Sequence, residues 1–142
     1  MLSKESQLKK VKLALKILLG VAFILAGINH FLNPAFYTKM MPTYIPMHYA
    51  MVILSGVTEI LVGSMLLIPS TTRIGAWGII AHLLVFFTVH IWMLQKADTL
   101  FKDIPVSALW GRLAFQFVFI AWAYWFTKTE PLTKTKEHTH EN

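Results

Sequence analysis

Four apolar runs, each long enough to cross a bilayer as a helix, constrain this chain more than any other feature of its sequence. A helix rises about 1.5 Å per residue and therefore needs about 20 residues to cross a hydrocarbon core of about 30 Å. Hydrophobic residues make up 56% of the chain and charged residues only 14%, a balance that is not typical of water-soluble domains. The sequence therefore predicts an all-α integral membrane protein with four spanning helices.

Prolines separate the runs and set the expected ends of the helices. Asn33-Pro34 follows the first run, because proline lacks an amide proton and disfavours helix in the residue before it. Pro46 precedes the second run and Pro69 follows it. The expected spans cover residues 13–32, 50–68, 74–94 and 107–127.

Lysine and arginine are distributed unequally around these spans. Nine of the 13 lie in the two tails, at the start of the first span and in the loop between the second and third spans, whereas three lie in the other two loops. Because cytoplasmic segments of membrane proteins are enriched in Lys and Arg, both termini are predicted to be cytoplasmic. We therefore expect an up-down bundle over residues 13–127, between a basic N-terminal tail (1–12) and a polar, disordered C-terminal tail (128–142).

The basic net charge of +6 follows from this topology and does not indicate nucleic-acid binding, because the charges flank apolar runs. The chain contains no cysteine, which excludes disulfides and thiolate metal sites. No phosphate-binding loop, nucleophile elbow or zinc-protease motif is present. No catalytic residue is therefore assigned.

Several polar side chains lie inside the predicted spans, where a charge near the centre costs at least about 2.5 kcal/mol on insertion scales. We therefore expect them to face one another. Counting from the span ends puts His30, His90 and Arg112 in one outer layer and Glu59 deeper, and the contact that we expect is an ion pair between Glu59 and Arg112. The candidate ligand or proton site comprises Glu59, Arg112, Gln116, His30, His90, His82 and Asn29.

Other interpretations of this cluster stay open. Buried polar residues in membrane bundles often only form hydrogen bonds between helices, and this structural role has about the same weight as a ligand or proton site. Haem held by His30 and His90 is a less favoured alternative, since no further pattern supports it. A metal site formed by these two histidines and Glu59 is equally weak, because the carboxylate lies in another layer.

Four short motifs occur in order within residues 20–125. Together they resemble the DoxX family of small four-helix membrane proteins, including its DoxX-like branch, although His82 and His90 match no position of the family pattern. The motifs are Ala26-Gly27-Ile28-Asn29-His30-Phe31 with Asn33-Pro34, Ser55-Gly56-Val57-Thr58-Glu59-Ile60-Leu61-Val62-Gly63, Ile68-Pro69 with Thr72-Arg73, and Gly111-Arg112-Leu113 with Gln116.

The resemblance implies a multi-pass protein of the bacterial cytoplasmic (inner) membrane with a redox-associated role. The leading hypothesis is an accessory subunit in respiratory or oxidative-stress chemistry, whose polar pocket binds a quinone or another small amphipathic ligand. Redox or oxidase subunits are its expected partners, besides the lipid bilayer, and the oligomeric state stays open. The alternatives are a proton-coupled transporter or proton-conducting subunit, and a membrane-embedded isomerase that uses a carboxylate and a histidine as acid and base.

Overall fold

The computed structural model describes residues 3–128, and this part of the chain is all-helical. Four of its five helices are long and apolar enough to cross a membrane, which confirms the predicted number of candidate spans. The C-terminal tail was expected to be disordered, and its residues from 129 onward lie outside the described range. The helices are α1 (Lys4–Leu32), α2 (Pro34–Met40), α3 (His48–Leu67), α4 (Thr72–Gln95) and α5 (Val106–Trp125).

The main differences from the sequence-based expectation are the start of α1 and the presence of α2. Helix α1 begins at Lys4 instead of residue 13, because the basic segment contains no helix breaker and Ser3 caps it by accepting a hydrogen bond from the Ser6 amide at 3.2 Å. Helix α2 was not predicted. Pro34 does end α1, but it also occupies the first turn of α2, where its fixed φ angle favours a helix.

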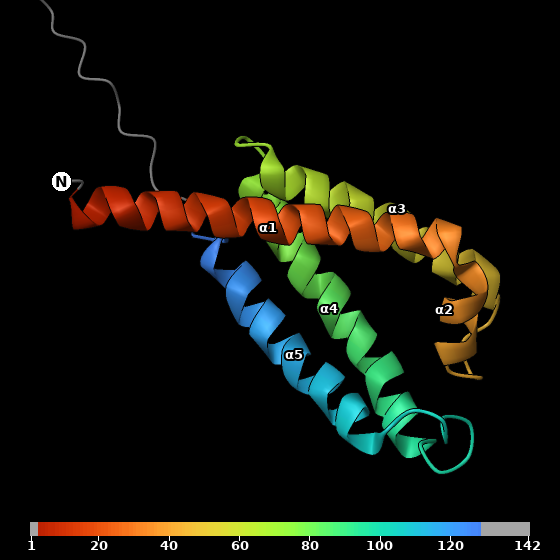
Figure 1. Cartoon of the computed structure of the whole chain (residues 1–142). Helices are drawn as coiled ribbons and strands as arrows, with labels where there is room; N and C mark the ends of the chain where they lie inside the picture. The colour runs from red at the N-terminus through yellow and green to blue at the C-terminus, as the bar shows by residue number, and fades with distance from the viewer. Residues whose placement is uncertain (1–2, 129–142) are drawn as a thin grey trace, which may run out of the picture.

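The long helices form two arms. Helix α1 packs along α3, while α4 packs against both α3 and α5, and α1 and α5 share few contacts. In Figure 1 the α1–α3 arm and the α4–α5 arm meet near the N-terminal part of α1 and diverge toward α2. The space between the arms therefore widens toward the end of the molecule where α2 lies.

Two reciprocal glycine contacts hold α1 against α3. A Cβ atom on Gly27 would lie 2.6 Å from the carbonyl oxygen of Gly56, and one on Gly63 would lie 2.8 Å from the carbonyl oxygen of Gly20. Such distances are too short for any side chain, so the backbones touch at both places. Small residues at these positions let the two helices approach closely.

Apolar clusters close the two ends of the α4–α5 arm. At the narrow end, buried side chains from four helices meet, among them Leu19, Leu66, Ile79 and Ala123. At the other end, Met93, Phe101 and Leu109 form a smaller cluster around the α4–α5 loop, with Met40 of α2 packed against it. The centre of the wide end, between these clusters, is not filled by apolar side chains.

Candidate ligand site

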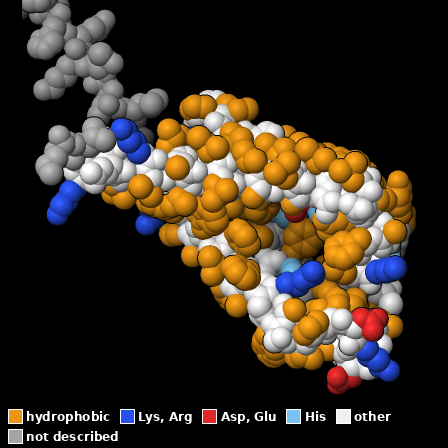
Figure 2. All heavy atoms as spheres, viewed as in Figure 1, with side chains coloured by type: hydrophobic (Ala, Val, Ile, Leu, Met, Phe, Trp, Pro, Cys, Tyr) orange, Lys and Arg blue, Asp and Glu red, His pale blue; other side chains and the backbone are white. Residues whose placement is uncertain are grey.

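A cavity of about 300 Å³ lies between the two arms, and all five helices contribute residues to it. Figure 2 shows a hollow between α1 and the α4–α5 arm, with acidic, histidine and basic atoms visible in a largely hydrophobic face. The volume is at the lower end of the range for small-molecule sites. Its polar lining residues are His30, Tyr37, Ser55, Glu59, His90, Arg112 and Gln116.

Glu59 on α3 lies between two imidazoles. Its Oε2 is 3.0 Å from His30 Nδ1 on α1, and its Oε1 is 3.2 Å from His82 Nε2 on α4. Glu59 and His30 are buried, at 6% and 4% exposure, and the His82 side chain is 11% exposed. Although these separations are those of ion pairs, neither Glu59 Oε2 nor His82 Nε2 has an aligned hydrogen-bond partner. The contacts are therefore mainly electrostatic.

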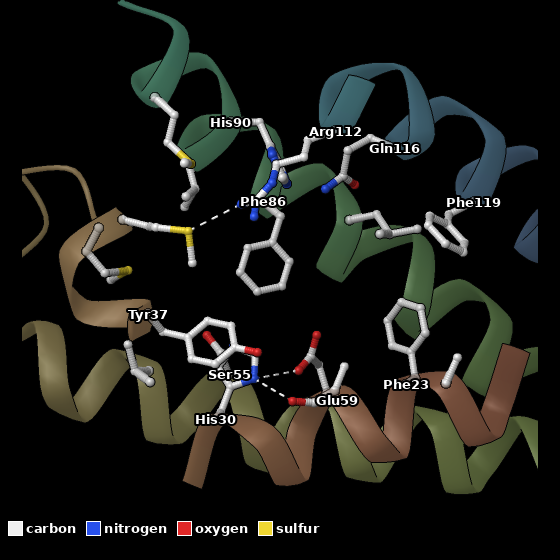
Figure 3. Close-up of a pocket in the computed structure, with 18 residues that line it drawn as sticks. Phe23, His30, Tyr37, Ser55, Glu59, Phe86, His90, Arg112, Gln116 and Phe119 are labelled. Carbon is white, nitrogen blue, oxygen red and sulfur yellow. Dashed lines mark hydrogen bonds and ion pairs between the residues drawn. The ribbon is translucent and has the colours of Figure 1, made fainter. Parts of the chain in front are cut away.

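The backbone of α1 fixes the orientation of the His30 ring. His30 Nδ1 lies 2.8 Å from the carbonyl oxygen of Ala26 as well as 3.0 Å from Glu59 (Figure 3). A carbonyl and a carboxylate oxygen both accept hydrogen bonds, so Nδ1 is the nitrogen that carries hydrogen and donates to Ala26. The glycine contact between α1 and α3 lies one turn away, at Gly27 and Gly56, and brings His30 to the carboxylate.

Tyr37 on α2 stacks on His30, with 3.8 Å between ring centroids and 16° between ring planes. Asn33 Nδ2 donates to Asn29 Oδ1 at 2.7 Å, and Asn29 Nδ2 donates to the Tyr37 hydroxyl at 2.5 Å. Asn29 therefore supports the cavity from behind and does not line it. Sequence reasoning missed Tyr37 because it missed α2; the aromatic pair after Pro34 was the signal that could have indicated it.

His82 also lies behind the cavity and not on its wall. Its Nδ1 is 3.4 Å from the hydroxyl of Thr58, which itself donates to the Ser55 carbonyl at 2.9 Å. Phe86 meets the His82 ring edge-on, at 4.3 Å between centroids, and separates it from the cavity. His82 thus contacts Glu59 from the side that faces away from the cavity.

The expected ion pair between Glu59 and Arg112 is wrong. Both residues line the same cavity, but from opposite walls, with Arg112, His90 and Gln116 on the α4–α5 arm (Figure 3). Arg112 Nη1 donates to the Met40 sulfur at 3.3 Å instead. The two side chains do not meet because the arms that carry them diverge at this end (Figure 1).

The structure therefore divides the predicted site into two groups. His30, Glu59 and His82 are in contact on one side, with Asn29 supporting them, whereas the α4–α5 residues face them across the cavity. The metal alternative assumed that His90 lies next to Glu59 together with His30. In the structure, the second imidazole next to Glu59 is that of His82 instead. Within residues 3–128, no group of three or more His, Cys, Asp or Glu is arranged to hold a metal ion.

Comparison with known families gives one match. A family model described as a domain of unknown function, DUF8561, matches residues 19–127, which include every residue that lines the cavity. No curated protein and no solved structure matches the chain. The resemblance to the DoxX family stays a prediction that rests on the motifs quoted above.

Proposed function

The chain belongs to the DUF8561 family of unknown function, and we propose that it is a multi-pass membrane protein that binds the polar head of a small amphipathic ligand between its two arms. One observation carries this proposal: a cavity of ligand size has polar residues on two facing walls and apolar residues elsewhere. Sites for small molecules have this composition, with a few polar groups in a mainly apolar pocket.

The route of entry supports an amphipathic ligand. Few contacts join α1 and α5, and the hollow between α1 and the α4–α5 arm opens at the surface of the molecule (Figure 2). If the four long helices span the bilayer, this side faces hydrocarbon. A ligand dissolved in the lipid could then enter sideways, with its polar head toward Glu59 and Tyr37 and its apolar part between the arms.

We also propose an accessory role in respiratory or oxidative-stress chemistry at the bacterial cytoplasmic membrane, beside redox or oxidase subunits. This part of the proposal comes from the resemblance to the DoxX family, which implies a quinone as the ligand. The cavity is compatible with such a ligand, because a quinone ring is flat and apolar with polar oxygen atoms at its edge.

Quinone binding can be measured by quenching of tryptophan fluorescence in nanodiscs, using a short-tailed benzoquinone as the probe. We expect saturable quenching, and about a fivefold weaker affinity for Glu59→Gln, the loss expected for about 1 kcal/mol of polar contact. Glu5→Gln, on the exposed first turn of α1, is the matched control and should bind as the wild type does. Quenching that does not saturate, or equal affinity for all three proteins, would refute the quinone site.

The same variants distinguish the proton-conducting alternative, which the contacts of Glu59 with His30 and His82 favour. Proteoliposomes with an internal pH dye report proton entry under an imposed potential. A flux that disappears in Glu59→Gln and persists in Glu5→Gln would replace the ligand-binding proposal with proton conduction. No flux above that of empty liposomes would eliminate the alternative.

A further inference from the structure

Arg112 carries a positive charge that no acidic side chain balances within the described part of the chain. The ion pairs found in residues 3–128 are the two that Glu59 makes with His30 and His82. The side-chain partner of Arg112 is the sulfur of Met40, which is a weak acceptor. A guanidinium in a membrane-spanning helix needs stronger acceptors, so this arrangement has room for an anion from outside the chain.

A groove on the α4–α5 arm leads to this guanidinium. It has a volume of about 400 Å³ and is lined by His90, Arg112, Phe115, Gln116 and Phe119. Gln116 is only 7% exposed, yet its Oε1 has no hydrogen-bond partner, and it lines both the groove and the cavity between the arms. Phe115, by contrast, is 62% exposed. The groove therefore has a polar inner end and an aromatic outer end.

The charge of the groove selects the kind of molecule that fits it. No carboxylate lines the groove, and Glu59, which lines only the neighbouring cavity, is in contact with two imidazoles. An anion is therefore attracted to Arg112 without a competing negative charge beside it. Arginine binds phosphate through two parallel N–H donors, and the unpartnered Gln116 oxygen can accept a hydrogen bond from a hydroxyl next to that phosphate.

We propose that this groove binds an anionic phospholipid of the surrounding bilayer. Its phosphate pairs with Arg112, a head-group hydroxyl donates to Gln116 Oε1, and one acyl chain lies along Phe119 and Phe115. Arg112 is in the second turn of α5, which begins at Val106, so the guanidinium is near enough to the helix end to reach a head group. The lipid borders the opening between the arms and uses polar groups of the α4–α5 wall, whereas the head of the ligand proposed above lies beside Glu59 and Tyr37 on the opposite wall.

Native mass spectrometry of the full chain in mild detergent tests this site. The probe is an equimolar mixture of phosphatidylglycerol and phosphatidylcholine with identical acyl chains. The wild type should retain phosphatidylglycerol preferentially, and Arg112→Met should lower that preference about fivefold, as expected for one basic side chain near a lipid phosphate. Arg73→Met, which removes the exposed arginine at the start of α4, is the matched control and should change it less than twofold.

Two further variants keep the test decisive if Arg112→Met folds poorly. Arg112→Lys should retain part of the preference because it keeps the charge, whereas Gln116→Leu should weaken it without changing any charge. Equal retention of both lipids by the wild type, or displacement of phosphatidylglycerol by an equimolar long-chain fatty acid, would overturn the assignment. A lipid preference without quinone quenching would support this site and refute the proposed function. Quinone quenching without a lipid preference would refute this site and support the proposed function.

Discussion

At the scale of single residues, the buried carboxylate of Glu59 is the feature that the surrounding structure must accommodate. Hydrocarbon disfavours a lone carboxylate, and the chain meets this requirement with His30 on one side and His82 on the other. The Ala26 carbonyl holds His30 by its Nδ1 atom, and Thr58 lies beside His82. The imidazoles are therefore positioned by α1 and α3 and do not depend on a ligand.

Glu59→Gln should consequently lower the stability of the protein. The amide keeps the shape of the side chain but removes the charge that attracts His30 and His82, so we expect a loss of about 1–3 kcal/mol in the free energy of unfolding. Reversible unfolding by sodium dodecyl sulfate in mixed micelles measures this quantity. Glu5→Gln should change it by less than about 0.5 kcal/mol. A Glu59→Gln protein as stable as the wild type would show that the two contacts make no net contribution to the free energy of unfolding.

The sequence predicted which polar residues would be buried but not how they would pair. His30, Glu59 and Gln116 are buried as expected, because hydrocarbon rejects such side chains wherever they lie. Pairing depends instead on how far apart the helices stand, and no pattern within one span carries that information. Arg112 illustrates this, since it lines the same cavity as Glu59 but lies on the arm that diverges from it (Figure 3).

At the scale of helices, glycine determines the distance between α1 and α3. Gly27 and His30 are one turn apart on α1, as are Gly56 and Glu59 on α3. The backbone contact between the two glycines therefore sets the separation of the two side chains. Helix α2 was missed because Pro34 was interpreted only as a helix end.

Gly27→Ala should separate the two helices. Its new Cβ would lie 2.6 Å from the Gly56 carbonyl oxygen and 2.8 Å from the Ile60 side chain, so we expect a loss of about 1–3 kcal/mol in stability from overpacking. Gly111→Ala is the matched control, because its Cβ would meet nothing within 4 Å. Alanine there should be neutral, or stabilising by up to about 1 kcal/mol, through its higher helix propensity. Equal effects of both substitutions in the same micelle assay would argue against the glycine contact.

At the scale of the whole molecule, the basic side chains gather at one end. Lys12 lies over the ring of Trp125 at 5.5 Å, so the start of α1 is close to the end of α5, and Lys128 lies over Tyr124 nearby. Lys96 lies over Trp92 at the end of α4, near the loop with few basic residues. The 29 residues of α1 span about 43 Å, more than a bilayer core requires, so its basic turns extend beyond the hydrocarbon.

This distribution of charge supports the proposed up-down arrangement with both termini in the cytoplasm, and single cysteines can test it because the chain has none. Ser70→Cys lies in the α3–α4 loop and Asp98→Cys in the α4–α5 loop, and both positions are exposed. A membrane-impermeant maleimide added to intact cells should label Asp98→Cys at once, but Ser70→Cys only after permeabilisation. The cysteine-free wild type should stay unlabelled. Labelling of Ser70→Cys alone in intact cells would show that the orientation is the opposite of the one proposed. Labelling of both positions would contradict a span between them, because α4 could not then separate the two loops.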